Sequence, residues 1–154
     1  MGVDYDLWEM PKPAQKKILG VGYSSTYLSN EDKNTVSYKM WMKMIHKCYS
    51  ESDYFKTKYK GSSECCNSWL DYQNFLRWFN KNYKENQNVS MFLTKRVISK
   101  DNTMYNPNNC AIVPKEIFDY LERAYENKGK ARELAENYKE SITEDIYELL
   151  TEDY

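Results

Sequence analysis

Two segments in the first half of the chain place apolar residues three or four positions apart, which is the spacing of one face of an α-helix. The first segment predicts a helix over residues 36–49. Its apolar face carries Tyr38, Trp41, Met44 or Ile45, and Cys48. The second predicts a helix over residues 68–84, opened by the capping-box pair Ser68 and Asp71. The residues that this helix is expected to bury are Trp69, Tyr72, Phe75, Leu76, Phe79 and Tyr83.

Short apolar runs between polar loops predict strands. Ile18–Tyr23 is expected to be a short strand in which Gly20 and Gly22 permit a bend or bulge. Residues 89–98 are rich in Val, Ile and Phe, and residues 110–113 form a second apolar run. Because asparagine-containing turn signals separate these two runs, they are expected to pair as a hairpin with a long loop.

The last third of the chain predicts further helices. Pro114 is expected to begin a helix that ends near Tyr125, since proline suits a first helical turn. A second helical segment covers residues 130–138. A last helix is expected after Ser141, which forms a capping-box pair with Glu144.

These elements together predict an α+β fold, with a small twisted antiparallel sheet packed by helices and a helical C-terminal extension. The expected organisation is an N-terminal arm of residues 1–17, an α+β domain of residues 18–118 and an acidic helical extension of residues 119–154. A chain of 154 residues is the length of one ordinary domain, with room for a small appendage.

Composition changes this picture in two ways. Aromatic residues make up 16% of the chain and 15 of them are tyrosines, which suit a thin core, an interface or a base-stacking surface. The net charge of −1 hides an asymmetry: residues 115–154 hold 6 Lys or Arg against 12 Asp or Glu, whereas residues 1–114 hold 16 against 11. Residues 1–114 are therefore net positive and residues 115–154 net negative, and such an asymmetry is a hint that charged surfaces take part in binding.

Several classes of protein are disfavoured. No run approaches the 18 consecutive apolar residues of a membrane span, and the first residues lack the basic and then apolar pattern of a secretion signal. No membrane association is therefore expected. The four cysteines, which are Cys48, Cys65, Cys66 and Cys110, are expected to be free thiols in the reducing cytoplasm of a host cell.

Catalytic and metal chemistry find little support. His46 is the only histidine, and it is predicted to share a helix face with lysines, where an exposed polar residue is more common than a general base. Cys48, Cys66 and Cys110 with His46 or Cys65 could make a zinc site, but no C-x2-C pair is present. Packing of Cys48, Cys66 and Cys110 beside Trp41 and Trp69 is the alternative that we favour. We expect no catalytic residue, metal or cofactor.

Basic residues near aromatic residues favour a nucleic-acid contact, because cations neutralise phosphates and aromatic rings stack on bases. Lys39, Lys43 and Lys47 fall on one face of the predicted 36–49 helix. The candidate nucleic-acid-binding residues are Lys39, Lys43, Lys47, Lys56, Lys58, Lys60, Lys95 and Arg96, with Tyr54, Phe55 and Tyr59 close to the second group. The alternative is a set of solubilising lysines over a core.

The order of several short motifs resembles a family common in bacteriophage genomes, described as HNH-endonuclease-like or related DNA-binding proteins. The motifs cover roughly residues 18–118, about two thirds of the chain. They are Gly20-Val21-Gly22-Tyr23, Tyr38-x-x-Trp41-x-x-Met44-x-x-Lys47-Cys48-Tyr49, Tyr59-Lys60-Gly61, Cys66-x-x-Trp69, Phe75-x-x-Trp78-Phe79, Lys95, Asn102, and Tyr105-x-Pro107-x-Asn109-Cys110-x-x-Val113-Pro114.

The resemblance implies a nuclease-like scaffold that has lost its chemistry. HNH-type enzymes need a histidine to activate water and further ligands for a divalent ion, and this chain has one histidine. Where relatives typically carry Leu-Asp-Lys-Asp, it has Leu93-Thr94-Lys95-Arg96. The leading hypothesis is a non-catalytic phage protein that binds nucleic acid.

Two other functions stay open. The first is a phage inhibitor that binds a host or defence protein, for which the acidic residues Glu144, Asp145 and Glu148 are the candidate contacts. The second is a residual metal-dependent nuclease. The sequence defines no oligomeric state.

Overall fold

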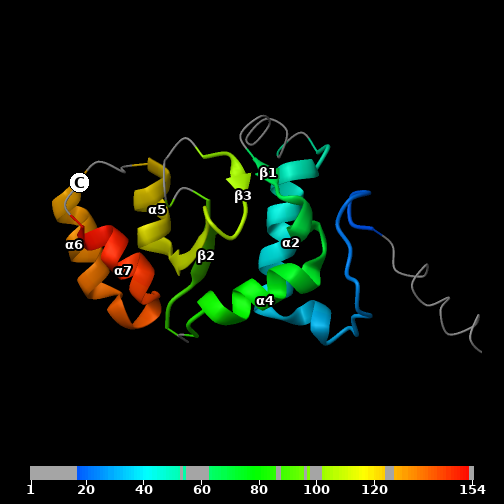
Figure 1. The fold of residues 1–154 in the computed structure, drawn as a ribbon, viewed down its shortest axis with the longest axis horizontal. Coiled ribbons are helices and arrows are strands. Elements are labelled where there is room, and N and C mark those ends of the chain that lie inside the picture. The colour runs from blue at the N-terminus through cyan, green and yellow to red at the C-terminus, as the bar shows by residue number, and fades with distance from the viewer. Residues whose placement is uncertain are drawn as a thin grey trace, which may run out of the picture. The chain divides into compact units, whose positions relative to one another are not determined.

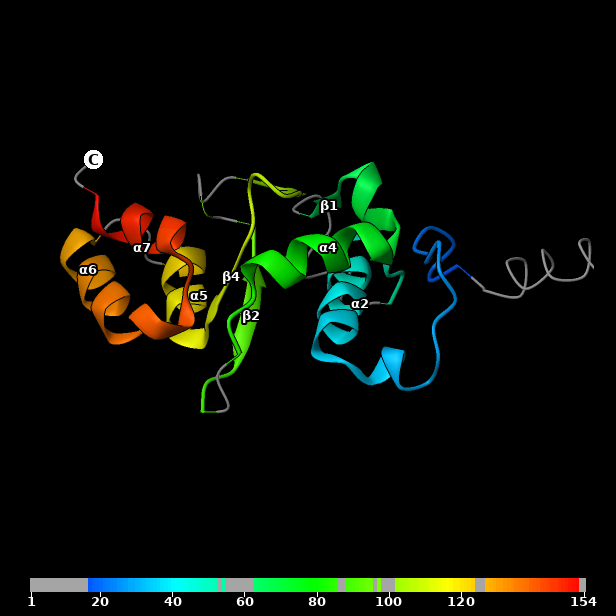
Figure 2. The ribbon, with the colours of Figure 1, turned by 60° about the horizontal axis from the view of Figure 1, so that its bottom comes forward.

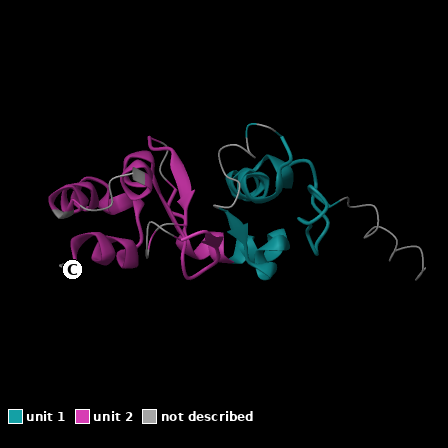
Figure 3. Cartoon of the chain, turned by 90° about the horizontal axis from the view of Figure 1, so that it is seen from above, with its two compact units in different colours: residues 1–77 teal, residues 78–154 magenta. Residues whose placement is uncertain are grey.

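The computed structural model describes residues 17–52, 54, 63–85, 88–95, 97, 102–123 and 127–152, with the side chains of residues 123 and 128 excepted. The chain divides into two compact units between Arg77 and Trp78 (Figure 3). The elements are η1 (Asp32–Asn34), α2 (Val36–Tyr49), β1 (Glu64–Cys65), η2 (Asn67–Leu70), α4 (Tyr72–Asn82), β2 (Met91–Thr94), β3 (Met104–Tyr105), β4 (Ala111–Pro114), α5 (Lys115–Arg123), α6 (Lys128–Asn137), η3 (Lys139–Ser141) and α7 (Glu144–Thr151) (Figure 1).

The predicted α+β class, with a helical C-terminal region, is confirmed. Helix α2 has the bounds that its apolar spacing predicts, and Thr35 caps it by accepting a hydrogen bond from the Tyr38 amide. Within the described part of the chain, no helix is long and apolar enough to cross a membrane.

Aromatic side chains build the core of the first unit. Trp41 of α2 is only 1% exposed, and its ring centroid lies 5.6 Å from that of Tyr38 and 5.4 Å from that of Tyr72. Its indole Nε1 donates a hydrogen bond of 2.7 Å to the Trp69 carbonyl, so the one polar atom of the buried ring is satisfied. The Trp69 ring in turn meets Phe75 edge to face at 4.9 Å.

Residues 18–23 form a tight turn, so the predicted strand is wrong here. Ile18 and Gly22 exchange backbone hydrogen bonds around the turn. Gly20 and Leu19 both have positive φ, of 79° and 53°, which only glycine adopts without strain. A Cβ on Gly22 would lie 3.1 Å from the Trp41 ring, so this glycine permits the turn to pass close to the core.

Asp71, rather than Ser68, caps helix α4. Its Oδ1 accepts hydrogen bonds from the amides of Gln73 at 3.0 Å and Ser25 at 2.9 Å. The predicted capping box therefore lies three residues too early, because the residues before Asp71 form the separate 3-10 turn η2. Of the side chains expected to be buried, Trp69, Tyr72, Phe75 and Phe79 are buried, while Leu76 and Tyr83 are half-buried.

Strands β2 and β4 pair antiparallel in the second unit, which confirms the predicted hairpin with its long connection. Met91 pairs with Pro114 and Thr94 with Ala111. Helices α5, α6 and α7 gather on one side of this pair (Figures 1 and 2). Their shared core contains Val97, Ala111, Val113, Ile117, Tyr120, Leu121, Ala131, Leu134, Ala135, Ile142 and Leu150.

The C-terminal helices are part of this core, so the predicted boundary between residues 118 and 119 has no structural counterpart and falls inside α5. Leu134 and Ala135 of α6 are fully buried, and Ile142 before α7 is 1% exposed. The described residues after position 118 are therefore part of this core, because their buried apolar side chains pack in one cluster with Ala111 and Val113 of β4. Thr143 caps α7 in place of the predicted Ser141, which is buried in η3.

Replacing Trp41 tests the core of the first unit. We expect Trp41→Ala to lower the free energy of unfolding by about 3–5 kcal/mol, because it leaves a cavity and removes the buried hydrogen bond to the Trp69 carbonyl. Urea denaturation followed by circular dichroism measures this loss. Tyr27→Ala, at a side chain that is 70% exposed, is the control and should have little effect. Equal stability of the two variants would contradict this account of the core.

The buried Tyr38 phenol predicts a loss of stability at alkaline pH. Burial, with a contribution from Tyr72, raises the pKa of Tyr38 above its ordinary value of 10.0. Since the folded pKa lies above the unfolded one, the stabilisation is complete below about pH 10 and is lost as the pH rises through the folded pKa. We expect the urea midpoint to fall in this range, and Tyr38→Phe to weaken that fall. An unchanged pH dependence in Tyr38→Phe would assign the alkaline loss to other groups.

Candidate functional site

The outward side of α2 carries a basic face, defined by Lys39, Lys43 and Lys47. Each lysine lies four residues from the next, so the three fall within roughly 80° around the helix axis. Lys39 and Lys43 are exposed and Lys47 is half-buried. The helix contains no acidic residue, so no carboxylate on the same element neutralises these charges.

The aromatic core sets the direction of the basic face. Trp41 and Ile45 are buried and lie on the side of the helix opposite to Lys43. The hydrogen bond from Trp41 to the Trp69 carbonyl and the edge-to-face contact of Tyr38 with Tyr72 at 5.2 Å fix the rotation of α2 about its axis. The basic face therefore points away from the core of its unit.

The spacing of the basic face suits a phosphate backbone. Successive lysines lie about 6 Å apart along the helix axis, given a rise of about 1.5 Å per residue. Phosphates of one nucleic-acid strand repeat about every 3.4 Å along the duplex axis, so two such repeats match one lysine interval to within the reach of flexible side chains. The face can hold a line of phosphates, and contacts to phosphates carry no sequence information.

The first unit, which carries the basic face, also has exposed aromatic rings. Tyr27 is 70% exposed and Tyr54 is 62% exposed, far above what a tyrosine needs to solvate its hydroxyl. Tyr23 is also exposed. Rings of this kind can stack on unpaired bases, which is a sequence-tolerant contact.

The other predicted basic residues contribute less. Lys56, Lys58, Lys60 and Arg96 lie outside the described residues. Lys95 is only 4% exposed, and its Nζ lies 5.0 Å from the centroid of the Tyr105 ring. Because its ammonium group is buried over an aromatic face, Lys95 does not present charge to an external phosphate. We therefore no longer count Lys95 among the candidate nucleic-acid-binding residues.

The surroundings of Thr94 favour a hydroxyl over a carboxylate at this position. Its side chain is fully buried, and Oγ1 donates a hydrogen bond of 3.0 Å to Oε2 of Glu122. An aspartate at this position would bring a second carboxylate against Glu122 in a buried setting, which is unfavourable for both charges. The threonine is therefore a structural partner of Glu122.

His46 lies half-buried on α2, next to the basic face. In the part of the chain that the structure describes, no three His, Cys, Asp or Glu side chains come together in a way that could hold a metal ion. The four cysteines are free thiols. Trp41, Trp69 and Cys110 are buried as predicted, but Cys48 and Cys66 are half-buried, and Cys65 is the buried member of its pair.

The acidic face of α7 is defined by Glu144, Asp145 and Glu148, and all three are exposed. Leu150 on the same helix is buried in the core of the second unit, while Ile146 and Leu149 are half-buried against it. The helix therefore has the apolar side and the charged back that its sequence predicts. Within its first turn, Glu144 and Asp145 favour the positive end of the helix dipole.

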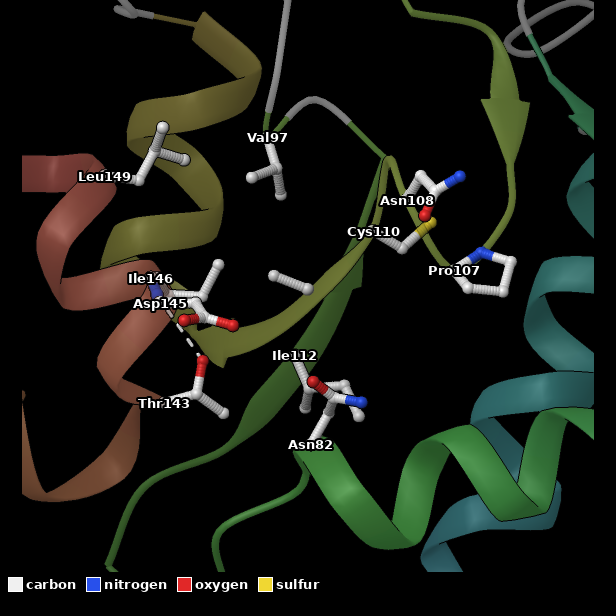
Figure 4. Close-up of a pocket in the computed structure, with 11 residues that line it drawn as sticks. Asn82, Val97, Pro107, Asn108, Cys110, Ile112, Thr143, Asp145, Ile146 and Leu149 are labelled. Carbon is white, nitrogen blue, oxygen red and sulfur yellow. Dashed lines mark hydrogen bonds between the residues drawn. The ribbon is translucent and has the colours of Figure 1, made fainter.

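A pocket of about 230 Å³ opens in the second unit beside the acidic face, and we call it the α7 pocket (Figure 4). Aliphatic side chains of β4 and α7 line its interior, including Ile112, Ile146 and Leu149. Its polar lining includes Asn82, Asn108, Thr143 and Asp145, and the Cys110 thiol is also present. The sequence predicted a partner contact only for Asp145 among these, because four separate segments build the pocket and no local motif joins them.

Comparison of the chain with protein-family models, with curated proteins and with solved structures finds no match. The resemblance to HNH-endonuclease-like proteins therefore stays a prediction, as do its implications for function.

The placement of His46 generates a prediction about nuclease activity. We expect the purified protein to leave plasmid and single-stranded DNA intact with magnesium, manganese, nickel or zinc, because the chain offers one histidine, whereas hydrolysis needs both a base that activates water and ligands that hold a metal ion. Gel electrophoresis after prolonged incubation measures this. DNA cleavage that disappears in His46→Ala would overturn the prediction and establish a residual enzyme.

Proposed function

We propose that this protein binds nucleic acid through the basic face of α2 and does not cleave it. The observation that carries the proposal is the exposure of Lys39 and Lys43 on an acid-free helix whose opposite side is anchored in an aromatic core. On this proposal the chain is a catalytically degenerate relative of the HNH-like proteins of phages, acting in the cytoplasm of the host.

Electrostatics would dominate such binding. Each lysine that neutralises a phosphate releases counterions, so affinity falls as salt rises and depends little on sequence. Exposed Tyr27 and Tyr54 would add stacking on unpaired bases, which favours single-stranded over duplex regions. The proposal therefore implies a binder of low sequence specificity.

The test removes the charge of the basic face and keeps the helix. We expect Lys39→Gln, Lys43→Gln and Lys47→Gln combined to reduce the slope of log affinity against log salt on duplex DNA. The reduction should be about 0.9 for each phosphate that the variant no longer neutralises. Fluorescence anisotropy with duplex and single-stranded oligonucleotides measures the slopes. Circular dichroism verifies that α2 is intact.

A matched triple variant tests whether binding depends on where the three charges lie or only on the net charge of the protein. Lys84→Gln, Lys115→Gln and Lys130→Gln change three exposed lysines of the second unit and give the same net charge. This control should keep most of the salt slope. Equal reductions in the two triples would show that binding follows net charge, and unchanged affinity in the α2 triple would refute the interface.

A second candidate function follows from the acidic face of α7. The exposed Glu144, Asp145 and Glu148 could meet a basic patch on a host or defence protein, which would make this chain an inhibitor. A packed helix holds these side chains at fixed spacing, which suits a specific protein contact better than a loose tail would.

Charge substitution tests this second candidate without removing α7. Truncation after Tyr138 would delete buried Ile142 and Leu150 and is expected to unfold the second unit. We expect Glu144→Gln, Asp145→Asn and Glu148→Gln combined to abolish recovery of a stoichiometric partner from nuclease-treated host lysate. Glu31→Gln, Glu51→Gln and Glu85→Gln form the matched control and should retain the partner. Equal recovery with both triples would refute the acidic face as an interface.

A further inference from the structure

The size of the α7 pocket limits what it can hold. About 230 Å³ lies below the roughly 300–1,000 Å³ of pockets that take whole small ligands or cofactors, so the pocket has room for a single large side chain. Val97, Ile112, Ile146 and Leu149 give it apolar walls that would cover an aliphatic stem.

Acceptors face the pocket. The Asn82 side chain donates its Nδ2 to the Trp78 carbonyl at 2.8 Å, which leaves its Oδ1 as an acceptor. Figure 4 shows this oxygen and the Asp145 carboxylate turned toward the same space between α7 and β4. An occupant must therefore bring hydrogen-bond donors and an apolar stem.

The electrostatic potential at the α7 pocket favours a cationic occupant. The N-terminus of α7 carries about half a positive charge from the helix dipole, but Glu144 and Asp145 bring two full negative charges into the same turn. The negative charges prevail, and Glu148 one turn further adds to them. An anion would be repelled from this pocket.

We propose that the α7 pocket binds the side chain of an arginine presented by a basic segment of a protein partner. The planar guanidinium can pair with both oxygens of Asp145 and still donate to Asn82, whereas a lysine ammonium is a compact point charge. The exposed Glu144 and Glu148 would attract the other cations of the segment. This inference rests on the second candidate function and names the chemistry of its partner.

The experiment titrates the full chain, labelled at its methyl groups, with the blocked peptide acetyl-Gly-Arg-Gly-amide and follows the methyl resonances by NMR. We expect saturable shifts at Ile112, Val97 and Leu149. The same peptide with citrulline, a neutral isostere of arginine, should bind about tenfold or more weakly, because it cannot form a charge-assisted hydrogen bond. Free butylguanidinium should bind more weakly than the peptide, since it lacks the backbone that a docked segment presents.

Point variants separate the pocket from the general field of the helix. Asp145→Asn should weaken peptide binding about tenfold or more, whereas Glu148→Gln changes the same charge on the same helix outside the pocket lining and should change it less than about threefold. Equal effects in the two variants, absence of pocket methyl shifts, or butylguanidinium binding as tightly as the peptide would each overturn the proposal.

The failure of the pocket and the failure of the second candidate function are distinguishable. If Glu144→Gln and Glu148→Gln together remove a protein partner while Asp145→Asn keeps it, the acidic face is an interface and the pocket is not its centre. If Asp145→Asn alone removes both the partner and the arginine peptide, both proposals stand.

Discussion

The burial of Trp41 is the constraint on which the first unit depends. Its ring needs a cover, which Tyr38 and Tyr72 provide, and its indole nitrogen needs an acceptor, which the Trp69 carbonyl provides. Gly22 suits this place because a Cβ there would lie only 3.1 Å from the same ring, so the buried ring would have to shift to admit a larger residue. These contacts fix the rotation of α2 about its axis, and Lys39, Lys43 and Lys47 therefore point away from the core.

A corresponding constraint shapes the second unit. An isolated two-stranded pair is not stable in water alone, and α5, α6 and α7 cover the side of β4 that carries Ala111 and Val113. The acidic residues of α7 are therefore carried by a helix whose other side completes a core. For this reason we expect the fold to tolerate changes of their charge but not removal of the segment.

The two candidate functions use surfaces of opposite charge on different units. The basic face of α2 suits phosphates, and the acidic face with the α7 pocket suits a cationic protein segment. Each surface stands on a packed helix, so substitutions at one should leave the other intact. A charged residue in the sequence need not contribute to a charged surface: Lys95 is buried over the Tyr105 ring.

Residue spacing alone is enough to predict the features that local periodicity controls. These are the bounds of α2, the basic and apolar sides of that helix, the β2–β4 pairing and the helical C-terminal region. Features that depend on partners distant in the chain emerge only in the folded molecule. These are the turn at residues 18–23, the caps Asp71 and Thr143, the burial of Lys95, the shared core of α5, α6 and α7 with the β2–β4 pair, and the α7 pocket. Which side chain covers a strand or meets an acceptor is set by the chain's path through space, and spacing along the sequence carries no information on that path.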